Sequence, residues 1–468
     1  MSAKPTEEPV FLTGSLMRHV SVMAFVSSVG LMAMFAVDFV DMIFISMLGN
    51  AALAAAVGFA GTILFFTNSI NIGLSIAAGS LVARAIGAHK AADAREYAAS
   101  VAVFGVVTGL AVPLIALPYL PQLLEFLGAT GEARDLAVSY LWIILPTMPV
   151  VSVAIISMAV LRAHGDARRS MMSTFLGSGV NAVLDPIFIF TLGMGLNGAA
   201  LASVVARFAM LYFALKPAIS VYDGFARPSW TMLRRDTAPV SAIALPAVLA
   251  NVATPVGAAI VTREIARFGT DAVAGMAIIG RLTPVAFAVV FALSGAIGPV
   301  IGQNFGAGQM TRVRSAFTAG LIFTGFYVVF AALILFLLRD LIAAAFDATG
   351  TAKDLIFLFS GPLALLFFFN GVIFVANATF NNLGRAGLST VVNWGRNTLG
   401  TWPLAILGGM WFGATGVLVG QALGGVLFAF VAILLAYRTM DQQPVPGVST
   451  EPFHGQKRFH LLFGRRNW

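Results

Sequence analysis

Long apolar stretches recur along this chain from residue 17 to residue 437, with only short polar segments between them. Each stretch has roughly 20 residues or more and can cross the roughly 30 Å hydrocarbon core of a bilayer as a helix. Only 10% of the residues are charged, whereas a soluble domain has roughly 25%. The sequence therefore predicts an all-α integral membrane protein that crosses the bilayer many times.

Most of the 28 Lys and Arg residues lie in segments on the side of the two termini, among them Arg84, Arg162 and Arg312. Positive residues mark the cytoplasmic side, so we expect both termini to be cytoplasmic. The net charge of +8 then reflects topology and not nucleic-acid binding. The twelve expected spans are 17–47, 51–82, 94–119, 135–161, 168–192, 196–219, 238–266, 271–302, 314–338, 353–382, 386–409 and 413–437.

The chain contains an internal repeat. At a shift of 219, SIAAGSLVARAIGA (75–88) aligns with SGAIGPVIGQNFGA (294–307), and LRAHGDARRS (161–170) aligns with FNNLGRAGLS (380–389). Six spans separate equivalent positions, so both halves have the same orientation, as in many transporters with parallel repeats. We expect a cytoplasmic N-terminal segment (1–16), a six-helix N-lobe (17–220), a cytoplasmic linker (221–237), a six-helix C-lobe (238–437) and a cytoplasmic C-terminal tail (438–468).

Three carboxylates lie inside apolar spans of the N-lobe. Asp38 and Asp41 share one helical face, because about 60° of rotation separates positions three apart. Asn181 and Asp185 lie one turn apart in another span, and Pro186 should kink that helix. A charge in a span costs about 2.5–3.5 kcal/mol on insertion scales. We interpret these residues as a proton or cation site, whose oxygen ligands suit Na⁺.

Structural pairing is the alternative interpretation. Arg207 lies mid-span in the N-lobe and could neutralise an aspartate, while Arg281 and Arg396 lie inside C-lobe spans. Each of the three could also extend its charge toward water. They remain candidate charge partners.

Several motifs carry a family resemblance over residues 20 to 440. They are VDMIFISMLGNAALAA, SLVARAIGAHKAADA with its repeat IGQNFGAGQMTRV, LRAHGDARRS, and GVNAVLDPIFIF with GLNGAALAS. With these motifs the chain resembles the multidrug and toxic compound extrusion (MATE) family. The resemblance implies two lobes, alternating access, and export driven by entry of H⁺ or Na⁺. The family's N-lobe cation site and its surroundings match Asp41, Asn181, Asp185, Tyr140 and Ser203.

The chain also departs from the family pattern. Asp38 stands where relatives often have an amide, and this additional acid favours H⁺ over Na⁺. Val26 occupies a position where many members have a proline, whereas Ser203 keeps the hydroxyl of a family Thr. The NorM branch has acids in spans 7 and 10, but here span 7 has no acid at mid-depth and span 10 offers Asn370 and Asn377. The chain therefore looks closer to the DinF-like branch.

We predict a secondary active multidrug efflux transporter that exchanges amphipathic, often cationic molecules for H⁺ or Na⁺. One alternative is a lipid-linked precursor flippase of related fold, which would need several basic residues inside its groove. Another is an intramembrane prenyl-transfer enzyme, but its paired aspartates would face the cytoplasm. Export requires no enzyme activity and no cofactor besides the coupling ion.

The remaining expectations concern partners and location. We expect a drug or toxin substrate and the lipid bilayer as partners, and a monomer is compatible with the sequence. The chain has no Cys, which excludes disulfides and thiolate metal sites. No organellar targeting signal is recognisable, which is compatible with a bacterial inner membrane.

Overall fold

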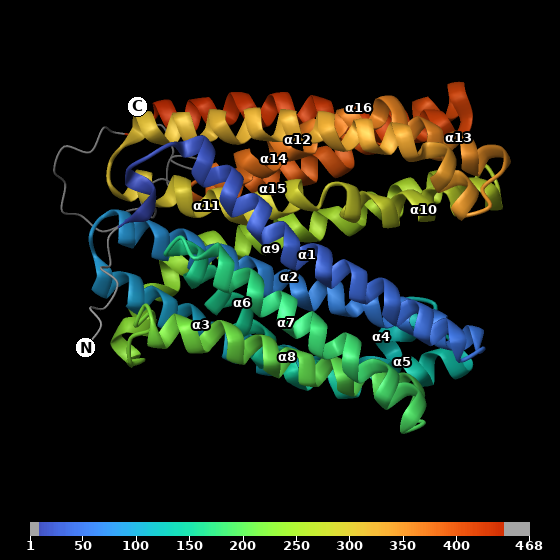
Figure 1. The fold of residues 1–468 in the computed structure, drawn as a ribbon, viewed down its shortest axis with the longest axis horizontal. Helices are drawn as coiled ribbons and strands as arrows, with labels where there is room; N and C mark the ends of the chain where they lie inside the picture. Colours follow the sequence, from blue (N-terminus) through green and yellow to red (C-terminus); the bar gives the residue numbers. More distant parts are fainter. Residues whose placement is uncertain (1–8, 444–468) are drawn as a thin grey trace, which may run out of the picture.

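The structure is a computed structural model that describes residues 9–443. The expectations for residues 1–8 and for most of the tail, 444–468, lie outside the described residues. All elements of the described part are helices (Figure 1). The first half contains η1 (Val10–Leu12), α1 (Leu16–Met47), α2 (Ala51–Gly87), α3 (Ala91–Ala116), η2 (Leu117–Tyr119), α4 (Leu120–Phe126), α5 (Gly131–Ile144), η3 (Leu145–Thr147), α6 (Met148–Ala163), α7 (Ala167–Pro186), η4 (Ile187–Thr191) and α8 (Gly195–Ser220).

The second half repeats this order with different interruptions. It contains α9 (Trp230–Ala266), α10 (Thr270–Ala286), α11 (Ala288–Gly306), α12 (Met310–Ala345), α13 (Gly350–Leu358), η5 (Phe359–Leu363), α14 (Ala364–Asn382), α15 (Gly387–Gly395), η6 (Arg396–Gly400) and α16 (Thr401–Asp441). Spans 4, 5, 10 and 11 each combine an α-helix with a short 3₁₀ or π segment.

Within the described residues, eleven helical segments are long and apolar enough to span a membrane. The expected count of twelve differs because the last segment, Gly387–Asp441, reverses direction at Gly413, where φ is 66° and ψ is −147°. Gly408 packs against Gly416, and Gly420 packs against Leu404, as in an antiparallel pair of helices. The predicted spans 11 and 12 are therefore both present, and the all-α fold with two six-helix lobes is confirmed.

Gly413→Ala should destabilise the protein. The φ and ψ of Gly413 fall in a region that is essentially restricted to glycine, and another residue there costs on the order of 1–3 kcal/mol. Thermal unfolding in detergent should show the loss. Gly425→Ala is the matched control, since Gly425 has no atom near its missing side chain. An equal loss in both variants would contradict the assigned reversal.

Two predicted boundaries differ from the structure. Span 8 (271–302) is interrupted at Phe287, because Pro284 removes a backbone donor and α10 ends within a turn. The linker predicted over 221–237 is shorter, because α9 already begins at Trp230. Its first turn is capped by Ser229, whose hydroxyl accepts the Met232 N–H at 3.3 Å.

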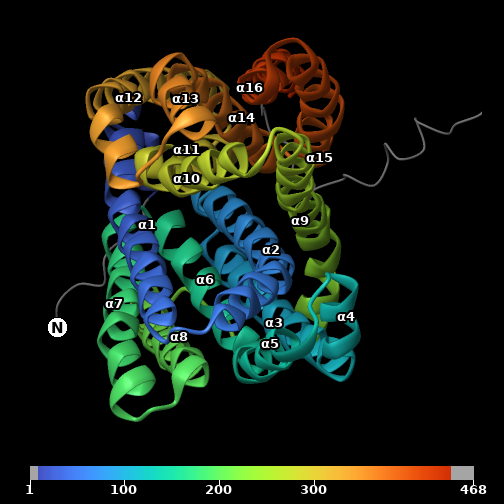
Figure 2. The same ribbon diagram turned by 90° about the vertical axis from the view of Figure 1, so that its right-hand side faces the viewer.

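The helices form two groups that touch at one end of the molecule and diverge toward the other (Figure 1). We call the end that carries both described chain ends the termini end. Helices α1 and α9 lie on opposite flanks of the boundary between the groups (Figure 2). Each packs across that boundary: α1 contacts α11 and α12, and α9 contacts α2 and α3. The first helix of each repeat is thus shared with the other lobe.

The lobes meet at the termini end through a pair of glycines related by the repeat. A side chain at Gly87 would overlap the backbone of Gln303, and one at Gly306 would overlap the backbone of Arg84. The shift of 219 residues that relates Gly87 to Gly306 also relates Arg84 to Gln303. This closed, two-fold symmetric crossing of α2 and α11 is the contact that the repeated motif encodes.

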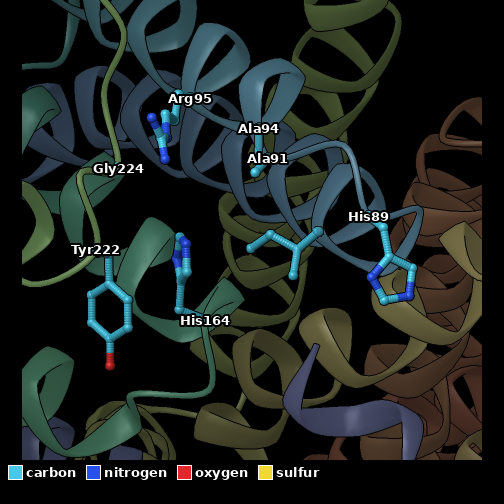
Figure 3. Close-up of a pocket in the computed structure, with 8 residues that line it drawn as sticks. His89, Ala91, Ala94, Arg95, His164, Tyr222 and Gly224 are labelled. Atoms are coloured by element: carbon cyan, nitrogen blue, oxygen red, sulfur yellow. The ribbon is translucent and has the colours of Figure 1, made fainter. Parts of the chain in front are cut away.

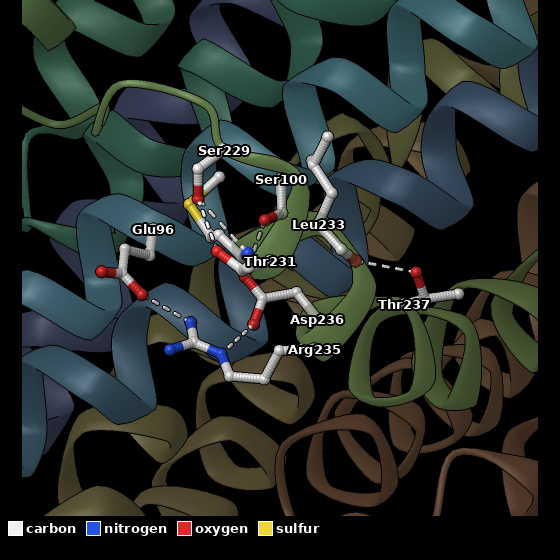
Figure 4. Close-up of polar contacts among 9 residues, drawn as sticks. Glu96, Ser100, Ser229, Thr231, Leu233, Arg235, Asp236 and Thr237 are labelled. Carbon is white, nitrogen blue, oxygen red and sulfur yellow. Dashed lines mark hydrogen bonds and ion pairs between the residues drawn. The ribbon is translucent and has the colours of Figure 1, made fainter.

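Two polar networks reinforce this end. Phe11 of η1 is buried between the lobes; its N–H donates to Gln303 Oε1 (2.9 Å) and its carbonyl accepts from Arg312 (2.9 Å). On the other flank, buried Asp236 of α9 accepts from the Ser100 hydroxyl of α3 (2.6 Å) and pairs with Arg235 (2.8 Å) (Figure 4). Both networks tie one lobe to the other.

Candidate functional site

An asparagine joins two carboxylates inside the N-lobe. Asn181 Nδ2 donates to Asp41 Oδ2 (3.1 Å) and to Asp185 Oδ2 (2.5 Å). Asp41 comes from α1, and the other two residues come from α7, which changes to the π turn η4 after Pro186. Asp185 is fully buried. The Oδ1 atoms of Asp41 and Asp185 accept no hydrogen bond from the described residues, which leaves two carboxylate oxygens for a proton or a cation.

Three further predicted residues surround this cluster. Asp38 lies about one turn from Asp41 on α1 and lines the central cavity, where its side chain is exposed. Ser203 on α8 lines the same cavity. Tyr140 on α5 packs against an apolar cluster of the N-lobe, within electrostatic range of Asp41. That these three residues take part in ion coupling stays a prediction.

The candidate charge partners make other contacts. Arg207 donates to the Thr147 hydroxyl (2.7 Å) and to a backbone carbonyl of α5 (3.0 Å). Arg281 is exposed on α10, with Nη2 3.7 Å from the sulfur of Met42. Arg396 begins the π turn η6. No ion pair between described residues joins any of these arginines to an aspartate.

A central cavity of about 770 Å³ lies between the lobes, a volume suited to a drug-sized ligand. Its N-lobe wall includes Asp38, Asp41, Asn181 and Arg207. Among its described lining residues the C-lobe contributes no acid, so the two walls differ in charge. The polar C-lobe residues on the wall are Asn251, Thr254, Ser294, Asn377, Asn381, Asn382, Ser389 and Asn393.

One charged residue that lines the cavity was not among the site residues predicted from the sequence. Arg162 was placed with the cytoplasmic segments, yet it lines the cavity from the last turn of α6 and donates from Nη1 to Ser170 Oγ (2.9 Å). The repeat contained a signal, because the shift of 219 that aligns Ser170 with Ser389 also aligns Arg162 with Asn381. The N-lobe motif therefore has a charged residue at a position where the equivalent C-lobe motif has an amide, and the two lobes differ there.

A second, smaller hollow of about 90 Å³ lies at the termini end, between α2, α3 and the segment after α8 (Figure 3). Arg95 pairs there with Asp223 at 2.9 Å, and Tyr222 donates to Asp166 at 2.9 Å. Burial, followed by the contact with Asp166, raises the pKa of Tyr222 to about 12. The phenol therefore stays protonated as a donor. These contacts hold the connecting segment in place.

A duplicated twelve-pass fold around a central cavity defines a multi-pass membrane transporter. The family model described as MatE matches residues 27–187 and 246–407, and the chain belongs to this family. The two matches begin 219 residues apart, which is the shift of the internal repeat. Members of the family are secondary transporters, so this chain is a transporter and not an enzyme.

Individual relatives agree with this assignment. The chain is 26% identical to a protein of Shewanella oneidensis named FAD transporter, over 88% of this chain and 92% of that protein. It is also 26% identical to the multidrug export protein MepA of Staphylococcus aureus, over 86% and 89%. An outward-facing structure of a MATE family multidrug resistance transporter superposes with a TM-score of 0.87, at 22% identity, over 94% of this chain and 99% of that one. That likeness concerns the fold.

Proposed function

We propose that this transporter is a cation-coupled antiporter that exports amphipathic small molecules from a bacterial cell across the inner membrane. The main observation behind this proposal is that Asn181 bridges Asp41 and Asp185. Each of these aspartates keeps one carboxylate oxygen without a hydrogen-bond partner among the described residues. Like charges held this close require a proton or a cation between them. H⁺ is the favoured coupling ion, because Asp38 adds a third carboxylate nearby. The basic residues of the termini end support a cytoplasmic location for that end, because positive residues mark the cytoplasmic side.

The coupling step follows from charge. Loading Asp41 and Asp185 with H⁺ or Na⁺ removes negative charge from the N-lobe wall of the cavity and so weakens the binding of a basic substrate. A ligand shifts a conformational equilibrium only through different affinities for the two states. Because α1 carries Asp41 and also packs against α11 and α12, a change at the ion site reaches the opposite lobe through one helix.

The rival functions make different demands on the cavity. A lipid-linked precursor flippase would place several basic residues inside the groove, whereas the described lining contains Arg162 and Arg207. The relatives named FAD transporter and MepA support export of small molecules. We therefore propose amphipathic drugs and toxins as the substrate class. The described cavity lining contains no acid from the C-lobe, which supports the proposed assignment to the DinF-like branch.

Efflux from proteoliposomes under separately imposed gradients tests the proposal. An inward-directed H⁺ gradient should drive export of a fluorescent amphipathic cation, and a Na⁺ gradient of equal size should drive less. Protein-free vesicles and collapse of each gradient with an ionophore provide the controls. Equal transport with and without both gradients would rule out the antiport mechanism.

A further inference from the structure

The cavity has a polar floor at its termini end with a repeated pattern. Arg162 Nη1 donates to Ser170 Oγ (2.9 Å) in the N-lobe, and Ser389 Oγ donates to Asn381 Oδ1 (3.1 Å) in the C-lobe. The repeat relates Arg162 to Asn381 and Ser170 to Ser389. All four line the cavity. The floor is therefore two equivalent hydrogen-bonding pairs, and only one of them is charged.

The charged member reaches toward the boundary between the lobes. Arg162 Nε lies 3.9 Å from the position that a Cβ of Gly295 would occupy on α11. One turn along α11, Gly298 faces Asn382, with Nδ2 at 3.4 Å by the same measure. Missing side chains at these two glycines leave room in front of the guanidinium and the amide.

The guanidinium has no acidic partner. No ion pair among residues 9–443 includes Arg162, and its hydrogen bond to Ser170 uses a single donor. Asn382, whose Nδ2 faces Gly298, also lines the cavity and is 3% exposed; its Oδ1 accepts no hydrogen bond from the described residues, so it can accept from a donor on a ligand and does not itself bind an oxyanion. An unpaired charge at such a place is costly unless a ligand compensates it.

We infer that this floor binds an oxyanion of the transported molecule, a carboxylate or a phosphate, through Arg162 and its neighbouring polar groups. A planar guanidinium fork matches the geometry of both oxyanions. The N-lobe carboxylates at Asp38 and Asp41 suit a basic group, so the cavity as a whole fits an amphoteric amphiphile with a basic and an acidic end. This inference rests on the proposed export function and narrows its substrate class.

A matched pair of probes tests the floor by equilibrium binding, without any ion gradient. A cationic xanthene dye with a free carboxylate and its methyl ester differ only in the anionic group. We expect the wild-type protein, in nanodiscs of phosphatidylcholine, to bind the acid more tightly than the ester in fluorescence polarisation. The opposite order would overturn the inference without any variant.

Arg162→Asn copies the C-lobe residue into the N-lobe position. We expect it to weaken binding of the acid about tenfold, the loss expected for one charge-assisted hydrogen bond, and to leave the ester unchanged. The unchanged ester also reports an intact cavity. Arg168→Asn, which removes an exposed charge from the same end of the molecule, should change neither probe. Equal losses for both probes, or no loss for the acid, would contradict an oxyanion site.

A lipid headgroup carries the same chemistry as a substrate phosphate. Repeating the measurement in nanodiscs that contain phosphatidylglycerol separates the two sources. The preference for the acid should persist, and its disappearance would assign the floor to lipid instead of to substrate. Because the assay needs no gradient, failure of ion coupling in vesicles and failure of the floor site produce different results.

Discussion

Replacing Asp41 by Asn should reduce gradient-driven export to the level of protein-free vesicles. The amide cannot release a proton and has no charge to hold Na⁺. Its oxygen can still accept from Asn181, so the contact between α1 and α7 at 3.1 Å can remain. Export should be measured in proteoliposomes under an imposed H⁺ gradient, with the thermal unfolding midpoint as a check on folding.

The matched control for this prediction is Asp135→Asn. Asp135 lies in the same lobe, but its side chain is 69% exposed, so the substitution removes a carboxylate from solvent. It should transport at the wild-type rate. Normal gradient-driven export by the Asp41 variant would remove this residue from the coupling site, and binding of an uncharged probe should stay unchanged in both proteins.

Substituting Ala at Gly306 should prevent closure at the termini end. The added methyl group would overlap the backbone of Arg84, and backbone atoms of packed helices cannot yield as a flexible side chain can. We expect the state that is closed at the termini end to lose population and export to fall strongly. Gly87→Ala should have the same effect, because the repeat places the symmetry-equivalent overlap with the backbone of Gln303 there.

The absence of Cys makes this prediction convenient to measure. Arg168→Cys and Thr311→Cys introduce exposed spin-label sites in the two lobes at the termini end. Pulsed dipolar spectroscopy should show a short distance in the parent protein and a longer one in the glycine variants. Gly58→Ala is the control, since Gly58 has nothing within 4 Å of its missing side chain. A short distance that persists in both glycine variants would contradict a closure contact.

The sequence predicted the fold well because its strongest signals are local. Span length follows from bilayer thickness, and the repeat follows from glycines that tolerate close helix packing, such as Gly87 and Gly306. The interruption at Phe287 was missed because Pro284 lies inside a long run that is apolar apart from Arg281. The reversal at Gly413 lies at the boundary that was expected between spans 11 and 12. The sequence did not predict the backbone conformation of this turn.

The sequence predicted the residues of the candidate site only where a side chain was unusual for its surroundings. Asp41, Asn181 and Asp185 stand out because carboxylates are costly in an apolar span, and the structure brings them into one hydrogen-bonded group. Arg162 did not stand out, because a basic residue at the end of a span is ordinary. Its place in the cavity depends on how deeply the opening between the lobes reaches, which is a property of packing that one span cannot encode.

The packing of each first helix against the other lobe has a consequence for biosynthesis. Phe11 hydrogen-bonds to Gln303, 292 positions later in the chain, and α1 packs against α11 and α12. When α1 enters the bilayer, these partners have not yet been made, so the face of α1 that will contact them must first be covered by lipid. The nascent protein therefore completes its assembly only after α12 emerges from the ribosome, and a chain truncated before that point would lack the contacts that hold its earliest helix.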